Sequence, residues 1–130
     1  MSTIFTKIIK KEIPAHIIFE DKYFISFLDI NPLTMGHALV VPKIEVDNIF
    51  DLEEKYLNKI LVFSKKIANA IEKSTHCSRV GIKVVGLEVP HAHIHLIPFI
   101  NEKEMDFMNK RLKLDESDFN SLLTKIKDKL

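Results

Sequence analysis

A run of histidines alternating with apolar residues constrains the fold more than any other feature. It reads His91-Ala92-His93-Ile94-His95-Leu96-Ile97. Alternation with a period of two predicts a half-buried β-strand, because successive side chains of a strand point to opposite faces. The three histidines would share one face at intervals of roughly 6.5–7 Å, while the residues between them face a core. We therefore predict a strand over residues 91–99 that carries a row of imidazoles.

Such a row has three interpretations: ordinary surface histidines, a metal site, or a site for an anionic group. The pattern His-x-His offers two zinc ligands. His91 and His95, however, would lie about 13 Å apart along a strand, too far to share one ion. The single Cys77 and the scattered acids suggest no further ligands. Imidazoles at this spacing can bind one phosphate-sized group and titrate near neutral pH, so we expect no metal.

Composition places the chain among ordinary globular proteins. Its 130 residues are 46% hydrophobic and 28% charged, and 19 basic and 18 acidic residues leave a net charge of +1. This length can bury a core without disulfides, and one cysteine suits a reducing compartment. The mixed charges form no basic stripe for nucleic acid, and no run approaches the ~18–20 apolar residues that span a bilayer. We predict one cytoplasmic domain, residues 1–130, that binds neither nucleic acid nor membrane.

Hydrophobic periodicity predicts an α+β fold. A long amphipathic helix is expected over residues 52–73, where apolar residues recur every three or four positions, with Asp51 and Glu54 as its capping box. A short amphipathic helix or turn is expected near the N-terminus, over residues 4–10. Together these patterns predict about five mostly antiparallel strands and one main helix. The strands are expected over residues 16–20, 23–29, 37–41, 79–85 and 91–99.

The tail, residues 101–130, is predicted to be helical. Met105, Met108 and Leu112 fall on one helical stripe, and a second helix is expected after a cap at Asp115. The mixed charges of the tail favour a plain helical cap on the domain. Covering a site or extending a dimer contact are the alternatives.

The histidine run also resembles a known family. It fits the pattern His-φ-His-φ-His-φ-φ, where φ is apolar, and an upstream block reads Gly36-His37-Ala38-Leu39-Val40-Val41-Pro42. With residues 4–9, 12–14, 19–21 and 27–32, in this order and spacing, the chain resembles the histidine triad (HIT) superfamily, and within it the purine nucleoside phosphoramidase branch. The resemblance covers residues 4–99. It implies the HIT-like fold, a homodimer, a purine nucleotide substrate and no cofactor.

The resemblance implies nucleotidyl transfer through a histidine. His93 would attack the α-phosphorus of a nucleoside 5′-phosphoramidate or related nucleotide, and water would hydrolyse the nucleotidyl-histidine. A neutral imidazole is nucleophilic at pH 7, which suits this role. Its other nitrogen is expected to donate a hydrogen bond to a backbone carbonyl in the same strand, which fixes the tautomer. His95 would hydrogen-bond the phosphate or protonate the leaving group, and His91 and His37 would complete the polar network.

The same matching suggests the nucleoside contacts. Asp29 would accept hydrogen bonds from both ribose hydroxyls, although an aspartate before Asn31-Pro32 can also simply begin a turn. Five apolar residues would form a slot around the base, with plain core packing as the alternative. They are Ile4, Phe5, Ile8, Phe27 and Ile30.

Two departures from the family pattern bear on these predictions. Thr3 and Thr6 stand where many bacterial relatives have zinc-binding cysteines, and Glu45 replaces a histidine, so no zinc is expected. The loop before the triad, residues 86–90, is short and lacks the asparagine and hydroxyl that contact phosphate. Glu88 falls near the hydroxyl position, and both Glu88 and Val89 are expected to contact the nucleotide. A carboxylate there repels phosphate unless it is protonated, paired or turned away.

Two other functions remain open from the sequence. A dinucleoside polyphosphate hydrolase would share the triad and differ in its leaving group. A nucleotide-binding or scaffold protein with little turnover would keep the fold and the altered loop. The sequence selects neither the purine base nor the leaving group.

Overall fold

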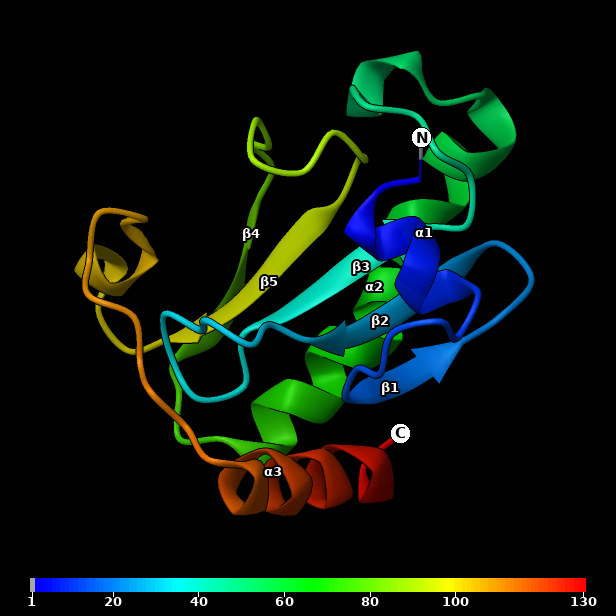
Figure 1. The fold of residues 1–130 in the computed structure, drawn as a ribbon. Coiled ribbons are helices and arrows are strands. Elements are labelled where there is room, and N and C mark those ends of the chain that lie inside the picture. Colours follow the sequence, from blue (N-terminus) through cyan, green and yellow to red (C-terminus); the bar gives the residue numbers. More distant parts are fainter. Residues whose placement is uncertain (1) are drawn as a thin grey trace.

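The computed structural model describes residues 2–130 (Figure 1). Five strands form one antiparallel sheet in the order β1-β2-β3-β5-β4, which confirms the predicted α+β class. None of the helices in this part of the chain is long and apolar enough to cross a bilayer. In chain order the elements are α1 (Ile4–Ile9), β1 (Ile17–Glu20), β2 (Phe24–Leu28), β3 (Ala38–Pro42), η1 (Ile49–Asp51), α2 (Glu54–Ser74), β4 (Arg79–Lys83), β5 (Ile94–Phe99), η2 (Glu102–Met105) and α3 (Glu116–Asp128).

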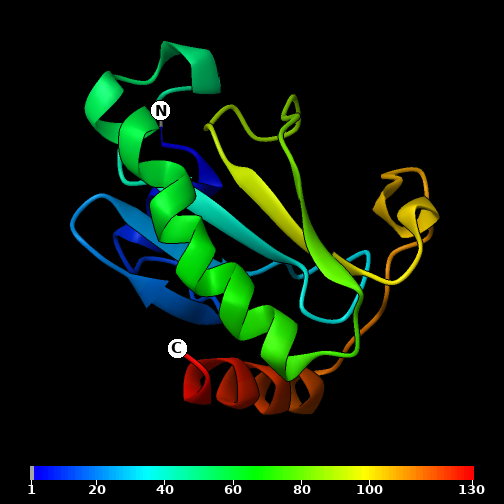
Figure 2. The same cartoon turned by 180° about the vertical axis from the view of Figure 1, so that it is seen from behind.

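Both faces of the sheet are covered, each by a different helix. Figure 2 shows α2 crossing one face, with α3 beside it, and Figure 1 shows α1 on the other. Along β2, Phe24 and Leu28 join the cluster under α2, whereas Ile25 and Phe27 join the cluster under α1. The central strands β2 and β3 are therefore buried at every position. The prediction of a half-buried histidine strand was wrong, because β5 is buried at all positions but its last and the Phe107 ring packs against His95.

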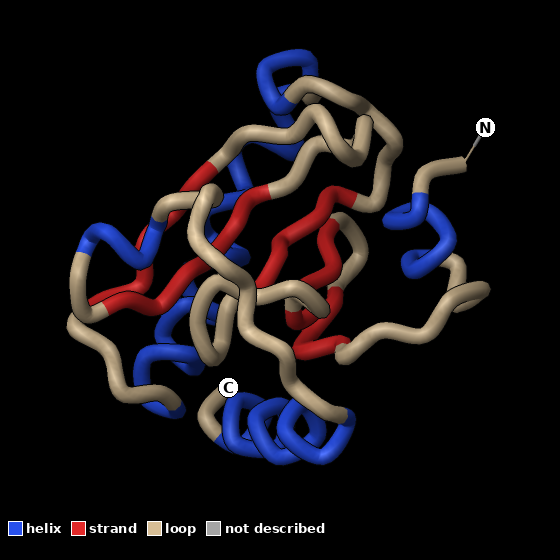
Figure 3. Tube along the Cα trace, turned by 60° about the vertical axis from the view of Figure 1, so that its left-hand side comes forward, coloured by secondary structure: helices blue, strands red, loops and turns tan. Residues whose placement is uncertain are grey.

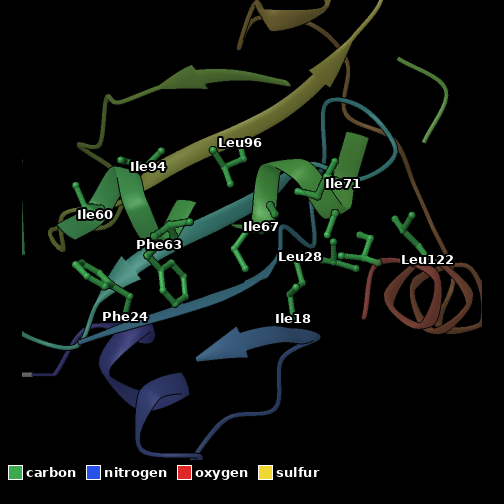
Figure 4. Packing of buried hydrophobic residues seen from close by; sticks show 14 of the residues in the cluster. Ile18, Phe24, Leu28, Ile60, Phe63, Ile67, Ile71, Ile94, Leu96 and Leu122 are labelled. Atoms are coloured by element: carbon green, nitrogen blue, oxygen red, sulfur yellow. The ribbon is translucent and has the colours of Figure 1, made fainter. Parts of the chain in front are cut away.

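The main core lies between α2 and the sheet. Figure 4 shows Ile60, Phe63, Ile67 and Ile71 of α2 directed toward strand residues that include Leu96. The steps of three and four residues that predicted this helix are the steps that place these side chains on one face.

We expect Leu96→Ala to lower the free energy of unfolding by about 2–5 kcal/mol, because it leaves a cavity in a tightly packed interior. Leu96 has no exposed surface. Leu61→Ala is the matched control, since Leu61 lies on α2 but is 58% exposed, and it should change stability by less than about 0.5 kcal/mol. Urea denaturation measures both. Equal losses would mean that the interior at Leu96 relaxes to fill the space.

Two predicted boundaries were wrong because backbone hydrogen bonds run elsewhere. The strand β5 begins at Ile94 rather than at residue 91, since the amide of His91 bonds to Val89 and that of Ala92 bonds to Val46. The expected capping box of α2 is absent. Asp51 lies inside η1, and α2 follows Glu53 with no side-chain cap.

The tail is only partly helical. The predicted stripe through Met105, Met108 and Leu112 was wrong, because η2 ends at Met105 and residues 106–114 contain turns and extended backbone. The side chain of Asp106 accepts a hydrogen bond from the Met108 amide, which favours a turn over a helix. In Figure 3 this segment runs in front of the strands before entering α3. The cap at Asp115 was predicted correctly.

Candidate active site

Four histidines gather on the face of the sheet that carries α1. His37 immediately precedes β3, His95 lies in the adjacent strand β5, and His91 and His93 occupy the segment leading into β5. All four are buried, with at most 7% of each residue exposed. The ring centroids of His93 and His95 are 4.9 Å apart, less than the strand spacing predicts. The ring of His95 therefore lies close to the rings of both His93 and His37.

The tautomer of His93 follows from one hydrogen bond. Its Nδ1 lies 2.6 Å from the carbonyl oxygen of His91. A carbonyl oxygen only accepts hydrogen bonds, so Nδ1 carries the proton and Nε2 keeps a free lone pair. The sequence predicts a bond from this nitrogen to a backbone carbonyl of the same strand. The acceptor is a backbone carbonyl, but it lies in the segment before β5.

A chain of hydrogen bonds fixes the tautomers of His37 and His95. The Leu33 amide donates to His37 Nδ1 at 2.9 Å, so the proton of His37 lies on Nε2. That nitrogen is 2.9 Å from His95 Nδ1 and donates to it. His95 must then carry its own proton on Nε2. The Leu33 amide thus fixes the tautomer of His37, and His37 fixes that of His95. As a result, the Nε2–H of His95 is a hydrogen-bond donor beside the free lone pair of His93.

The rings of His37, His91 and His95 are uncharged at neutral pH. Burial lowers the pKa of both His37 and His95 to about 3, with nearby positive charges acting in the same direction. Burial also lowers the pKa of His91. These three imidazoles can donate and accept hydrogen bonds but bring no positive charge to an anion.

Asp29 lies at the edge of this network. Its Oδ2 is 3.5 Å from His37 Nε2, and its Oδ1 accepts a hydrogen bond from the Asn31 amide at 2.8 Å. Asp29 therefore starts a turn, as one of the two interpretations expects, and its carboxylate also faces His37. Its binding of ribose hydroxyls stays a prediction. Burial raises its pKa.

Asp29, His37 and His95 place one potential ligand atom each within 4.8 Å of one another. No local sequence pattern indicates this grouping, because the three residues come from separate segments, after β2, before β3 and within β5. The ring nitrogens that face each other, His37 Nε2 and His95 Nδ1, are already joined by a hydrogen bond.

The expected base slot divides into two groups. Phe5, Ile8 and Phe27 are buried in the cluster between α1 and the sheet, as the core interpretation expects. The Phe5 ring also packs edge-on against His93, with centroids 5.0 Å apart. Ile4 and Ile30 are 46% and 63% exposed, so these two remain accessible to a ligand.

The short loop before the histidines packs against His93. Gly86 has a φ of +91°, and a Cβ at this position would lie 3.3 Å from His93 Cε1. Glycine therefore allows the close approach of the backbone. Glu88 is exposed, and with Ile4 and Val89 it lines a pocket of about 270 Å³. The Glu88 charge reaches the site, since it is one cause of the raised pKa of Asp29.

His91 belongs to a separate network at the N-terminus. Its Nε2 donates to the Pro42 carbonyl at 2.9 Å, so Nδ1 accepts from the Thr3 hydroxyl at 3.0 Å. Thr3 Oγ1 in turn accepts from the Thr6 amide. Glu45 accepts from the Thr3 amide and, at 2.5 Å, from the Thr6 hydroxyl. This cluster connects the start of α1 to the segment that carries His93.

We expect Thr3→Val to destabilise the fold by about 1–3 kcal/mol, because it leaves the buried Nδ1 of His91 without a donor. Thermal unfolding measures the effect. Thr124→Val is the control, since the exposed Thr124 hydroxyl bonds within its own helix, to Asn120. If both variants lose the same stability, the bond from Thr3 to His91 contributes nothing specific.

Three further side chains lie beside His95. Lys83 is its cross-strand partner in β4, and the Phe107 ring is centred 4.8 Å from the His95 ring. The guanidinium carbon of Arg111 lies 5.0 Å from the centroid of the Phe107 ring. The register of two antiparallel strands could have indicated Lys83. Phe107 and Arg111 follow no local pattern, because their segment is irregular.

The comparison with known proteins identifies the family. The family model described as HIT domain matches residues 10–101. The chain belongs to the HIT family. A HIT-like protein of Borreliella burgdorferi, described as uncharacterized, is 36% identical over 95% of this chain and 94% of its own length. Adenosine 5′-monophosphoramidase HNT1 of Saccharomyces cerevisiae is 40% identical over 77% of this chain, which spans 64% of that enzyme.

Solved HIT structures also cover the tail. A HIT-like protein of Bartonella henselae, described as involved in cell-cycle regulation, matches with a TM-score of 0.86 and 28% identity. The match covers 99% of this chain and 96% of that one. The tail therefore lies outside the family model but inside the structural similarity.

A Zn-bound histidine triad protein of Mycobacterium smegmatis is also similar, with a TM-score of 0.80 and 29% identity over 98% of this chain and 95% of that one. The positions that the sequence associates with zinc hold Thr3, Thr6 and Glu45, and the fourth side chain of this cluster is His91, which is bonded to Thr3. Protein zinc sites use thiolate, imidazole and carboxylate ligands. Two of the four groups here are neutral hydroxyls, and the Thr6 hydroxyl is bonded to the Glu45 carboxylate. This donor set does not fit a structural zinc site.

Proposed function

We propose that this HIT protein hydrolyses a purine nucleoside 5′-phosphoramidate or related nucleotide through a nucleotidyl intermediate on His93. One observation carries the proposal. The bond from His93 Nδ1 to the His91 carbonyl leaves Nε2 free as a nucleophile, beside the Nε2–H donor of His95. The phosphoramidase-named yeast relative supports the same reaction class.

In the first step, His93 Nε2 attacks the α-phosphorus and the bond from phosphorus to the leaving nitrogen breaks. The amine takes a proton from solvent. The His93 ring then carries a positive charge, which the carbonyl bonded to Nδ1 stabilises. In the second step water attacks the phosphorus, the bond to Nε2 breaks, and the nucleoside monophosphate leaves with loss of one proton to solvent.

His95 has the properties of a hydrogen-bond donor rather than of an acid in this reaction. Its buried ring is neutral, with a pKa of about 3, so its Nε2–H can bond to a phosphate oxygen without giving up the proton. His37 keeps that donor in place, and His91 supplies the carbonyl that orients His93.

The nucleoside contacts belong to the same proposal. Asp29 would bind the ribose hydroxyls, and the exposed Ile4 and Ile30 would contact the base above Phe5, Ile8 and Phe27. Glu88 and Val89 would border the phosphate. A single domain, a cytoplasmic location, a homodimer, and the absence of nucleic-acid partners remain predictions from the sequence.

The test is turnover of adenosine phosphoramidate followed by chromatography, with acid quenching and mass spectrometry to locate a nucleotidyl adduct. We expect adenosine monophosphate as product and an adduct on His93. Turnover of dinucleoside polyphosphates alone would favour the alternative hydrolase. Binding of nucleotide without turnover of any substrate would favour the scaffold interpretation.

A further inference from the structure

The active site has an unmet requirement for positive charge. His37, His91 and His95 are neutral at pH 7 because burial lowers their pKa values. The loop before the triad adds Glu88, whose charge is negative. Phosphoryl transfer develops negative charge on phosphate oxygens, and preorganised cations are the usual means of stabilising it.

Lys83 brings one cation to this place. It is the direct cross-strand partner of His95 in the antiparallel pair β4–β5, and such partners project from the same face of a sheet. Its Nζ donates to the Met105 carbonyl at 2.9 Å and lies 4.4 Å from the centroid of the Phe107 ring. Its charge contributes to the lowered pKa of His95.

Arg111 brings a second cation from the tail. Its guanidinium carbon lies 5.0 Å from the centroid of the same Phe107 ring, and Nη1 donates to the Asn31 carbonyl at 2.8 Å. A guanidinium has five N–H donors, so most remain available for an anion. Its charge affects the pKa values of Asp29 and His95, so it acts within the site.

Both cations lie against the ring of Phe107. Its ring is centred 4.8 Å from the ring of His95 and 6.5 Å from that of His37. Among residues 2–130, no carboxylate lies within 4.0 Å of Lys83 Nζ or of the Arg111 guanidinium. Two like charges beside one ring, without a paired acid, leave a position where an anion is stabilised.

We propose that Lys83 and Arg111 form, around Phe107, a subsite for the phosphate of the nucleotide. This inference rests on the proposed function and assigns part of the site to the tail, outside the matched HIT domain. The His95 Nε2–H and the two cations would bind the phosphate oxygens while His93 attacks the phosphorus. The subsite supplies positive charge to a site in which the short loop, residues 86–90, carries the Glu88 carboxylate instead of a hydroxyl.

The test compares the binding of AMP and of adenosine to Lys83→Gln and Arg111→Gln by calorimetry. A charge-assisted hydrogen bond contributes about 1.5–3 kcal/mol, so AMP affinity should fall about 10- to 100-fold in each variant. Adenosine lacks the phosphate, and its affinity should stay within about twofold. Lys83→Arg should restore AMP binding, and inorganic phosphate should compete with AMP in the wild type only.

The control is Lys110→Gln, since Lys110 is exposed and adjacent to Arg111 in the chain. It should bind AMP as the wild type does. Lys83 lies on a strand and Arg111 in the tail. If one variant fails to fold, AMP binding by the other variant still tests the subsite. Unchanged AMP affinity, or equal losses for AMP and adenosine, would overturn the subsite. If the wild type binds AMP but turns over no substrate, the proposed function fails while the subsite remains testable by binding.

Discussion

His93→Ala is expected to abolish turnover of adenosine phosphoramidate, with a fall in kcat of at least about 10³-fold. Among residues 2–130, the variant removes the one ring that combines a bonded Nδ1–H with a free Nε2 lone pair beside His95 Nε2. The hydrogen-bond chain from Leu33 through His37 to His95 does not pass through His93 and should persist. AMP affinity should therefore stay close to that of the wild type while hydrolysis stops.

Steady-state kinetics and calorimetry on the same preparations measure the two quantities. His76→Ala is the matched control, because His76 is exposed and lies outside the network. It should keep both kcat and AMP affinity. A His93→Ala protein that still forms a nucleotidyl adduct would place the nucleophile on another side chain. Loss of AMP affinity together with activity would assign His93 to binding rather than to attack on phosphorus.

The sequence could predict the parts of this site that follow from local period. Alternation placed His95 on the face opposite Ile94 and Leu96, and the five-stranded α+β fold followed from short apolar runs around one long amphipathic helix. Alternation alone, however, could not show where hydrogen bonding to the neighbouring strands begins. His91 and His93 therefore lie before β5, in a segment whose amides bond to loops.

The contacts that decide the chemistry depend on long-range packing. The tautomer of His95 is set by the amide of Leu33, which carries no side-chain signature. Phe107 and Arg111 reach the histidines because the irregular tail crosses the sheet, where the Leu112 amide bonds to the Pro32 carbonyl. A periodic pattern could not predict that the tail lies here. The helical stripe expected through Met105, Met108 and Leu112 predicted a helix, whereas residues 106–114 are irregular.

The neutral histidines also predict a marked sensitivity to acid. A histidine in the unfolded chain has a pKa near 6.5, whereas folding lowers the pKa of His37 and of His95 to about 3. Between these values the unfolded chain binds more protons than the folded protein, so stability falls as the pH falls. From pH 6.5 to pH 4.5 the loss should be about 2 kcal/mol for each ring, or about 4 kcal/mol for the two. The lowered pKa of His91 acts in the same direction.

Urea denaturation between pH 6.5 and pH 4.5 measures how the free energy of unfolding changes with pH. The variant His37→Gln shows how much of this change comes from His37. A glutamine amide can accept from Leu33 and donate to His95 as the neutral ring does, but it does not titrate. This variant should lose about half as much stability between pH 6.5 and pH 4.5 as the wild type. His76→Gln, at an exposed position, should keep the wild-type slope. An unchanged slope in His37→Gln would mean that folding does not lower the pKa of His37, and the neutral tautomer assigned to that ring, with Nδ1 accepting from the Leu33 amide, would be wrong.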